Sequence, residues 1–340
     1  MCFFLFFWFS KSYNCLNMNE RIDNPANSIF YVSDCFFQRS FKDWSVPRGG
    51  MIFISGNGYH LTIVSSAFYM CQCVGWGGAI WFNSSIGGEC VFNKICAYEC
   101  YAWYNLFSIA IVGNNMYNNC SFLSISACAP SYQYTNNSQS FSMQYGKQFI
   151  ESLNSSKNYG NTCTSLLLCH GEFCRARFSN FVSNYASYSI CIYFYYQFIS
   201  NECSYMNFYS NYQSMINYGQ IFAYNSSFSF VHTHFSGNNQ KLFSNLNTCQ
   251  VTLMECVINH ASTSFKDGTI FTSICQIQTN LIPASYFFTH FSTFKCNTYP
   301  QPTAALTPRL TPAPSYDPTK YFPITQYNNI LMLVFLLDEF

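Results

Sequence analysis

The sequence predicts an all-β protein, and within that class a right-handed parallel β-helix of about ten coils. Three observations predict it. Two short motifs recur at intervals close to one coil, apolar residues alternate along each motif, and charged residues make up only 9% of the 340-residue chain. Alternation is the period of a strand rather than of a helix. A repeat of this size cannot bury its own apolar face, but it can do so when it is stacked on a neighbour.

The first motif is a small residue or a glycine pair followed by an apolar strand. Its copies are Gly49–Ile54, Gly77–Phe82, Phe107–Ile111, Ser165–Leu168, Ser189–Ile192, Gly219–Phe222 and Gly268–Phe271, with room for a further copy at Leu242–Phe243. Ile80 follows Ile52 by 28 residues, and Ile109 follows Ile80 by 29. We therefore expect these three isoleucines to lie at equivalent inward positions on successive parallel strands.

The second motif follows the first and contains a cysteine or aromatic residue and then F-x-x-N or F-x-N. Its copies are Cys90–Asn93, Cys120–Phe122, Phe178–Asn184, Phe208–Asn211 and Phe235–Asn238. The spacing predicts that Phe92 and Phe122 form a second inward ladder, one corner away from the isoleucines. Asparagine side chains are expected to form ladders at the corners.

The low charge has a physical reason in a stacked solenoid. Two like charges about 5 Å apart repel by roughly 1 kcal/mol in water, and a ladder repeats that repulsion at every coil. An antiparallel sandwich or barrel would explain the alternation equally well, but it gives no reason for a repeated G-G-x-I. The balance of 15 Lys and Arg against 14 Asp and Glu, without a basic face, argues against nucleic acid as a partner.

The N-terminal residues 1–29 are interpreted as a degraded signal segment together with an N-terminal cap. The apolar run at residues 2–9 has signal-peptide length, but no basic region precedes it and no clear small-residue cleavage site follows it. The alternative is an ordinary buried strand. Residues 30–297 are the predicted β-helix.

The C-terminal part is predicted to hold a Pro/Thr-rich stalk at residues 298–323 and a tail at residues 324–340. The tail contains the apolar run Ile330–Leu337, which is shorter than the roughly 20 residues that a bilayer span needs. We interpret the run as a truncated membrane tether. The rival interpretation is a short hydrophobic tail that packs on the body.

The 19 cysteines, without a repeated C-x-x-C pair, favour an oxidising compartment. We expect a mixture of disulfides and buried thiols, although many of the cysteines would serve equally well as small buried hydrophobic residues. N-x-S/T sequons support secretion weakly, because a chain rich in Ser and Asn produces them by chance. They lie at Asn83, Asn119, Asn136, Asn154 and Asn225.

Catalytic, cofactor-binding and metal-ligating residues are all assigned as none. Carbohydrate-active β-helices need clustered carboxylates, and the nearest acidic pair in the body is Glu89 and Glu99. On a strand, His232 and His234 would share one face where a metal could bridge them, but no third ligand is near in the sequence, and strand packing explains them.

Two cysteine patterns receive the same interpretation. Cys71 and Cys73 would also share one face of a strand, yet one isolated pair is not a zinc site. The adjacent Cys169 and His170 would point to opposite faces of a strand, so they cannot form a thiolate and imidazolium pair with each other.

The motifs Gly77–Ile80, Phe178–Phe181 and Phe208–Asn211 resemble those of the polymorphic outer membrane proteins of chlamydiae. The resemblance is greater still to Cys-, Tyr- and Asn-rich relatives in some parasitic protists. It implies a β-helical surface protein, often proposed as an adhesin, with no catalytic residues to carry over. The predicted function is therefore that of a non-catalytic cell-surface or secreted protein that binds an unknown protein or glycan. The alternatives are a β-helical polysaccharide-active enzyme and a truncated, non-functional family member.

Overall fold

The computed structural model divides the chain into two units, Met1–Thr298 and Tyr299–Phe340. It describes residues 11–14, 21–23, 28–38, 48–126, 128, 139–160, 163–186, 191–197, 201–214, 219–239, 241–246, 249–259, 270–273 and 275–278. The apolar run at residues 2–9, the predicted stalk and the predicted tail lie outside these residues.

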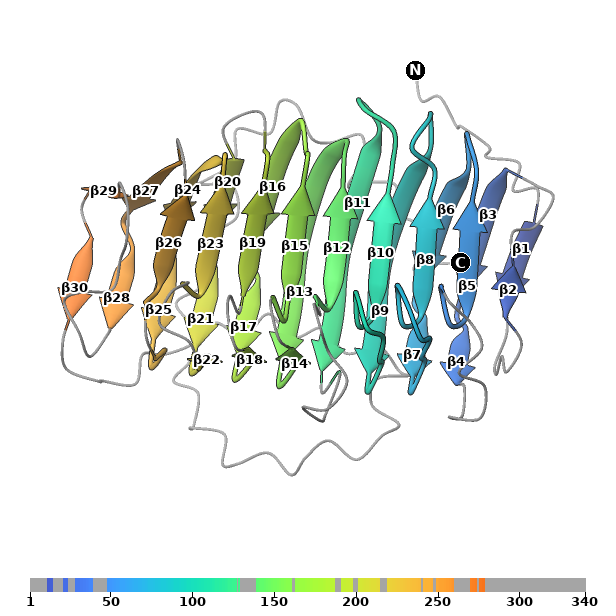
Figure 1. Ribbon diagram of the computed structural model, residues 1–340, viewed down its shortest axis with the longest axis horizontal. Coiled ribbons are helices and arrows are strands. Elements are labelled where there is room, and N and C mark those ends of the chain that lie inside the picture. The colour runs from blue at the N-terminus through green and yellow to red at the C-terminus, as the bar shows by residue number, and fades with distance from the viewer. Residues whose placement is uncertain are drawn as a thin grey trace, which may run out of the picture. The chain divides into compact units, whose positions relative to one another are not determined.

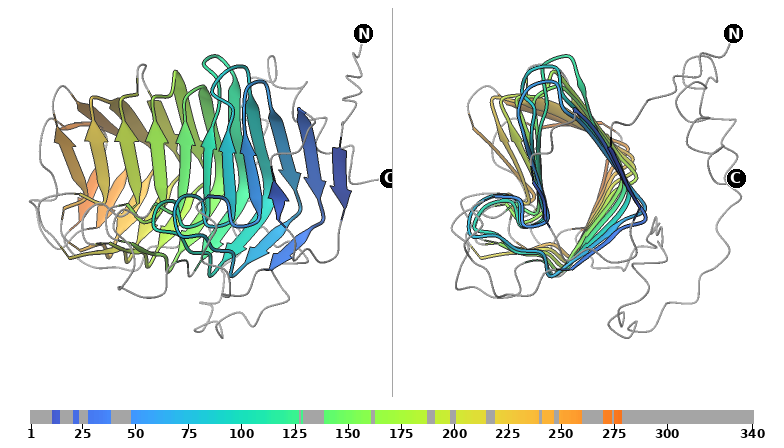
Figure 2. Two further views of the ribbon diagram at one scale, coloured as in Figure 1. Left: turned by 45° about the vertical axis from the view of Figure 1, so that its right-hand side comes forward. Right: turned by 90° about the vertical axis from the view of Figure 1, so that its right-hand side faces the viewer.

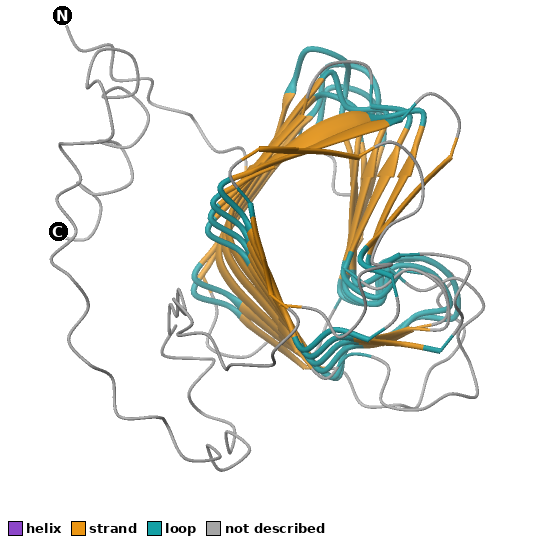
Figure 3. Ribbon diagram, turned by 90° about the vertical axis from the view of Figure 1, so that its left-hand side faces the viewer, coloured by secondary structure: helices purple, strands orange, loops and turns teal. Residues whose placement is uncertain are grey.

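The described residues form an all-β parallel β-solenoid of about six turns, in which the strands of successive turns lie side by side (Figure 1). Every pairing between the described strands is parallel and in register. The antiparallel sandwich is therefore wrong for this chain. Seen end-on, the strands of successive turns superimpose into walls around a common interior (Figures 2 and 3).

The strands belong to three sheets. The nine-stranded sheet holds β2 (Ile22–Asp23), β5 (Ile52–Ser55), β8 (Ile80–Asn83), β10 (Ser108–Ile111), β12 (Phe141–Gln144), β15 (Leu166–Cys169), β19 (Ile192–Tyr195), β23 (Ile221–Tyr224) and β26 (Phe243–Leu246). The 18-stranded sheet holds β1 (Lys11–Asn14), β3 (Ile29–Ser33), β4 (Phe36–Gln38), β6 (His60–Val64), β7 (Ala67–Tyr69), β9 (Glu89–Tyr98), β11 (Tyr117–Ser126), β13 (Lys147–Ser156), β16 (Phe173–Arg177), β17 (Asn180–Val182), β20 (Asn201–Ser204), β21 (Asn207–Tyr209), β24 (Ser227–Val231), β25 (His234–Ser236), β27 (Gln250–Met254), β28 (Val257–Asn259), β29 (Ile270–Ser273) and β30 (Gln276–Gln278). The three-stranded sheet holds β14 (Tyr159–Gly160), β18 (Tyr185–Ala186) and β22 (Tyr212–Gln213).

The first motif forms strands of the nine-stranded sheet, as predicted from its spacing. Ile52 pairs directly with Ile80, and both side chains are fully buried. The prediction for Ile109 is wrong by one residue, because Ser108 pairs with Ile80 while Ile109 pairs with Trp81. A shift of one residue places a side chain on the other face of the sheet, so Ile109 lies on the outer face although it is buried.

The final copy of the first motif was also placed wrongly. Ile270 begins β29, which pairs with β27. This copy therefore lies in the 18-stranded sheet, together with the second motif, and not in the nine-stranded sheet. The predicted intermediate copy is confirmed, because Phe243 pairs with Ile221.

The second motif contains a corner that the sequence did not reveal. Phe92 pairs with Cys120, and not with Phe122. Phe122 has a positive φ of 51° and is skipped in the pairing of β11 with both neighbours. It therefore marks a left-handed corner that bends the 18-stranded sheet, and the predicted Phe92–Phe122 ladder does not exist.

This first corner recurs at the same register position in successive turns. The residues at it, all with positive φ, are Asp34, Ser65, Lys94, Phe122, Ser152, Phe178, Tyr205, His232 and Glu255. A second corner of the same kind follows the next strand segment, at Met70, Glu99, Lys157, Ser183, Ser210 and Gly237. A non-glycine residue in this conformation costs roughly 1 kcal/mol, so the backbone hydrogen bonds between turns hold each corner in place.

The residue after the second corner points inward and forms a continuous ladder. In the later turns it is asparagine, at Asn158, Asn184, Asn211 and Asn238. The backbone N–H of each of the first three donates to the Oδ1 of the next, at 3.0 to 3.1 Å. The predicted asparagine ladder is confirmed for these turns.

In the earlier turns the same position holds Cys71, Cys100 and Cys128. The thiol of Cys100 donates to the carbonyl of Phe68 at 3.6 Å, as the amide of Asn211 donates to the carbonyl of Phe181 at 2.9 Å. Buried thiols thus replace amides in one interior column.

Phenylalanine side chains fill the interior beside this ladder. Phe181 stacks on Phe208 and Phe208 stacks on Phe235, each with ring centroids 4.9 Å apart. Phe37 and Phe68 stack in the same way at 4.6 Å. The F-x-x-N motif therefore supplies an aromatic core residue and, three residues later, the amide of the interior ladder.

The glycine pairs are required by close approach between turns. A Cβ atom on Gly78 would lie 2.0 Å from the carbonyl oxygen of Leu106, and one on Gly50 would lie 2.2 Å from that of Gly78. Gly49 and Gly77 have positive φ values of 54° and 67°. The pair thus combines a left-handed turn with backbone contact against the next turn.

Both expected kinds of cysteine occur among the described residues. Fourteen of them are outside any disulfide, and all of these except Cys275 are buried. Cys35 and Cys96 each take part in a disulfide. Most of the described cysteines thus serve as small apolar core residues.

Candidate functional site

Stacked aromatic side chains line the outer surface in three columns, which we call the outer aromatic ladders. The first is Tyr159, Tyr185 and Tyr212, the second is Phe178, Tyr205 and His232, and the third is Tyr145, His170 and Tyr196. Neighbouring ring centroids lie 4.5 to 5.4 Å apart, with interplanar angles of 8° to 20°.

The backbone places two of the ladders directly. The second ladder occupies the first left-handed corner, with φ values of 52°, 50° and 50° along the column. The third occupies a corner after the strands of the nine-stranded sheet, where Tyr145, His170 and Tyr196 have φ values of 62°, 50° and 50°. In-register coils then bring the rings to the inter-strand spacing of about 4.8 Å, which suits offset stacking.

The first two ladders each include an exposed tyrosine ring. Tyr205 is 43% exposed and Tyr212 is 49% exposed. Because the rings within a ladder cover one another's faces, their edges are what the ladder presents to solvent. At Tyr205 and Tyr212 a partner would therefore meet an exposed phenol ring on a rigid scaffold.

The sequence contains the signal for the ladders, although our sequence prediction did not use it. Phe178, Tyr205 and His232 follow one another at intervals of 27 residues. This period is the coil length in that region, and it would have placed the three rings in one column once the register was known.

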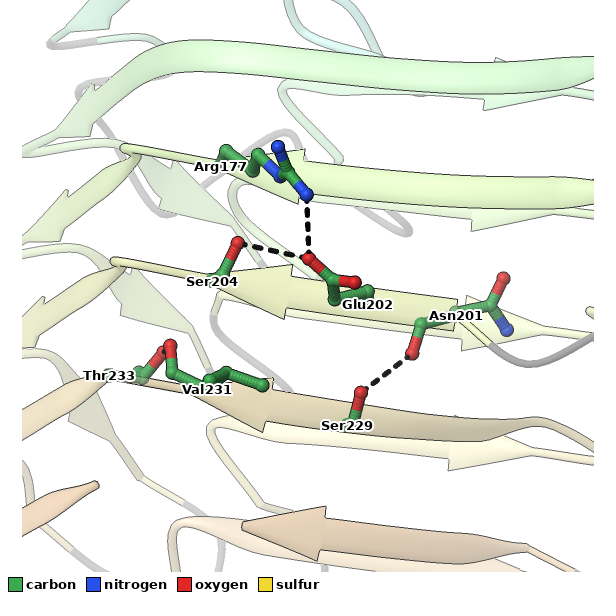
Figure 4. A network of polar contacts seen from close by, with 7 residues as sticks. All are labelled: Arg177, Asn201, Glu202, Ser204, Ser229, Val231 and Thr233. Atoms are coloured by element: carbon green, nitrogen blue, oxygen red, sulfur yellow. Dashed lines mark hydrogen bonds and ion pairs between the residues drawn. The ribbon is translucent and has the colours of Figure 1, made fainter. Parts of the chain in front are cut away.

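A cluster of charged residues lies on the outer face of the 18-stranded sheet (Figure 4). Arg177 Nη2 donates to Glu202 Oε1 at 2.9 Å, and Ser204 Oγ donates to the same oxygen at 3.3 Å. Both side chains of the ion pair are partly exposed, at 28% and 39%. Such a pair contributes about 1 kcal/mol or less to stability.

Glu151 joins this cluster because it pairs in register with Arg177. Desolvation of its carboxyl group by neighbouring side chains raises the pKa of Glu151, and the Arg177 guanidinium acts in the opposite direction. Two carboxyl groups and an arginine thus share one surface. Sequence spacing did not indicate this group, because its members come from three successive turns.

The acidic pair selected from the sequence does not come together. Glu89 begins β9, where its Oε2 lies 3.5 Å from His60 Nδ1. Glu99 lies in the second left-handed corner, beyond the other end of the same strand. Its charge and hydrogen bonds contribute to raising the pKa values of Tyr69 and Tyr98, after burial of these tyrosines.

The two histidines do not share the face of a strand. His232 lies at the first corner, with its Nδ1 3.2 Å from Glu255 Oε2. His234 begins β25, and its burial lowers the pKa of its imidazole. Because His232 is itself the corner residue and His234 lies on the strand that follows, the strand geometry that the sequence suggested is wrong.

The cysteine patterns also separate. Cys71 belongs to the interior ladder, whereas Cys73 packs with Ala102 in a small cluster of its own. Cys169 ends β15, and His170 is at the corner that follows. Within the described residues, no three His, Cys, Asp or Glu side chains are grouped so as to hold a metal ion.

No helix in the described part of the chain has the length and apolar character to cross a bilayer. Comparisons of the chain with protein-family models, with curated proteins and with solved structures gave no match. The chain has the fold of a parallel β-solenoid, with aromatic ladders on its surface.

Proposed function

We propose that this chain is a non-catalytic cell-surface or secreted protein that binds a protein or glycan partner through its outer aromatic ladders. The observation that carries the proposal is the exposure of Tyr205 and Tyr212, each of which stacks on another ring of its ladder. Tyrosine offers large contact area at low entropic cost and is enriched among residues that dominate binding energy. A solenoid also holds such residues in fixed positions over a long face.

The proposal includes the finer architecture expected from the sequence: a right-handed β-helix of about ten coils, followed by a Pro/Thr-rich stalk. The strong right-handed preference of parallel β crossovers supports the handedness. The close turn at Gly77–Gly78 and the interior position of Asn211 support a relationship to the polymorphic outer membrane proteins. The glycine pair allows close approach between turns, and the asparagine forms the interior ladder, as a stacked repeat requires.

Location is tested first. Intact cells that produce the protein are treated with a membrane-impermeant amine reagent, and the protein is then recovered and its labelled fraction measured. Surface exposure predicts labelling of the intact cells or recovery from the medium. An abundant protein that is labelled only after lysis would contradict the proposal.

Binding is tested with purified full-length protein on partner cells. The double variant Tyr205→Ser and Tyr212→Ser removes two exposed rings, and we expect at least a fivefold loss of attachment. The control is Ile86→Ser, which removes a side chain that is 65% exposed and belongs to no ladder. Equal attachment by the double variant and the wild type would rule out the ladders as the contact surface.

A second candidate function, a polysaccharide-active enzyme, is favoured by the raised pKa of Glu151 beside Arg177 and Glu202. A carboxyl group whose pKa is raised is better suited to act as a general acid, while a second carboxylate acts as base or nucleophile. Depolymerisation of an acidic or neutral polysaccharide that is abolished by Glu151→Gln, and retained by Glu89→Gln, would establish it in place of the binding function.

A further inference from the structure

Tryptophan, tyrosine and arginine side chains meet at one corner of the early turns, which we call the Arg–Trp corner. Arg48, Trp76 and Tyr104 pair in register along the solenoid. The Trp76 ring stacks on Tyr104 with centroids 4.3 Å apart, and it meets Trp81 edge-on at 6.2 Å. The Arg48 guanidinium carbon lies 4.7 Å from the centroid of the Trp81 ring.

Two hydrogen-bond donors at this corner have no acceptor within the part of the chain that the structure describes. Trp81 is only 6% exposed, and its indole Nε1–H is buried without a partner among the described residues. Arg48 is exposed, and its guanidinium makes the contact with Trp81 but no hydrogen bond or ion pair in the described part of the chain. A buried N–H without an acceptor is rare in folded proteins and calls for an explanation.

A second guanidinium supports the position of the first. Arg21 Nη2 donates to the backbone carbonyl of Arg48 at 2.9 Å, and its own guanidinium lies 5.0 Å from the ring of Phe53. Phe53 is the register neighbour of Trp81. Arg21 is ion-paired with Asp23 at 3.3 Å, so Arg48 is the cation that is available to a ligand.

We propose that the Arg–Trp corner binds a pyranose that carries a carboxylate, such as a uronic or sialic acid unit of a glycan. This inference rests on the proposed binding function and names its ligand class. Arg48 pairs with the carboxylate, and the indole N–H of Trp81 donates to a sugar oxygen when Arg48 swings from the ring toward the ligand. The exposed part of Trp76, which is 37% exposed, packs against the C–H face of the sugar.

The chemistry of the corner favours a sugar over a peptide. The negative face of an indole attracts polarised C–H groups and cations, and a pyranose presents such a face with oxygens around its rim. An extended peptide needs both donors and acceptors from its receptor. The Arg48 guanidinium and the Trp81 indole offer donors only, which match a ligand rich in acceptor oxygens and negatively charged.

Isothermal titration calorimetry on the purified full chain tests the ligand class. The carboxylate probes are 3′-sialyllactose and trigalacturonate, the neutral probe is lactose, and the peptide probe is a Glu-rich decapeptide. We expect at least one carboxylate sugar to bind while lactose and the peptide do not. We also expect weaker binding at higher ionic strength, because the contact to Arg48 is charged.

Two variants separate the donors. Arg48→Gln should weaken binding about tenfold or more, the loss expected for a charge-assisted hydrogen bond. Trp81→Phe keeps an aromatic ring but removes the N–H, and it should weaken binding several-fold. The matched controls are Lys147→Gln, a cation over the Tyr117 ring at 5.3 Å, and Trp103→Phe, an indole that is 47% exposed. Both controls should bind as the wild type does.

The inference fails if lactose binds as well as the carboxylate sugars, if no sugar binds, if the peptide binds instead, or if Arg48→Gln and Lys147→Gln have equal effects. Arg48→Gln alters an exposed residue and should fold normally, which a thermal melt checks. The same variant in the cell-attachment assay separates the two proposals. Attachment that survives Arg48→Gln but not the Tyr205 and Tyr212 changes leaves the binding function standing without the sugar site. Sugar binding without cell attachment would leave the sugar site standing and contradict the proposed binding function.

Discussion

The side-chain oxygen of Asn211 accepts two hydrogen bonds from Asn184 of the preceding turn, from its backbone nitrogen at 3.0 Å and from its Nδ2 at 3.1 Å. Asn184 in turn accepts from the backbone nitrogen of Asn158 at 3.1 Å. Each side-chain amide thus hydrogen-bonds to the backbone at the corner of the adjacent turn and fixes the register between the two turns. The interior ladder therefore sets register as well as satisfying buried polar groups.

Replacing Asn184 by Ala should destabilise the fold by about 3 kcal/mol, since it leaves buried donors and acceptors of two turns without partners. Urea unfolding followed by circular dichroism measures the change. Asn154→Ala is the control, because Asn154 is only partly buried and accepts from Asn180 at 2.7 Å on the outer face. Equal losses for the two variants would mean that the interior ladder has no special role.

Replacing Ile80 by Asp should prevent folding or cost about 4 kcal/mol or more, because it places an unpaired charge in an apolar interior. Ile80 is fully buried and lies directly against Ile52. Ile86→Asp makes the same chemical change at a side chain that is 65% exposed, and should alter stability by less than about 1 kcal/mol. Thermal melts of both variants check the difference, and similar melting temperatures would contradict the packing of Ile80.

Replacing Gly78 by Ala should be more damaging than replacing Gly87 by Ala. Gly78 faces the carbonyl oxygens of Leu106 at 2.0 Å and Tyr101 at 2.6 Å, and backbone atoms cannot move aside cheaply. Gly87 has a positive φ of 69° but open space around its Cβ position. Its variant should therefore lose only about 1 kcal/mol of conformational energy. Denaturant midpoints that fall in the opposite order would show that close approach between turns is not what requires glycine.

Stability should decline above about pH 8.5, the ordinary pKa of a cysteine thiol in an unfolded chain. Burial raises the pKa values of Cys163 and Cys174 to about 12. Because the folded pKa is the higher one, the contribution of each neutral thiol is complete below the unfolded pKa and is lost as pH rises toward the folded one. Denaturant midpoints measured between neutral pH and about pH 11 follow the loss.

The double variant Cys163→Ala and Cys174→Ala provides the control for this pH dependence. It will be less stable at neutral pH because it leaves small cavities, but its midpoint should fall less steeply on the alkaline side. An identical slope for wild type and variant would assign the alkaline loss to the tyrosines or to other thiols.

The solenoid could be predicted because the clearest copies of the first motif form strands that pair directly with each other. The pairing of Ile52 with Ile80 follows directly from their 28-residue spacing. The one-residue error at Ile109 arose because the coil from Ile80 to its partner Ser108 has 28 residues, one fewer than the spacing to Ile109, and Ser108 is a polar residue at an inward position. Hydrophobicity alone selects the neighbouring isoleucine. Phe141, which continues the same column, was missed because Ser140 and Ser142 around it hide the pattern.

The functional surface was less predictable than the core. The corner at Phe122 has no glycine or proline to mark it, since Phe, Tyr, His and Lys adopt the same positive φ at equivalent positions. The Arg177 cluster and the Arg–Trp corner join residues from different turns, so their membership depends on register. One-residue uncertainty in register is harmless for locating a solenoid, but it moves every outer side chain to the opposite face.

The first left-handed corner has a consequence for how this surface can change. Its backbone shape is the same whether the residue is acidic, basic, aromatic or a serine, as Glu255, Lys94, Tyr205 and Ser65 show. Substitutions there leave the interior untouched, so the chain carries a row of positions about 4.8 Å apart whose chemistry can diversify without refolding the scaffold. Such a row is suited to rapid evolutionary change of binding specificity. It also offers protein engineers a linear array of positions at which binding residues can be introduced one turn at a time.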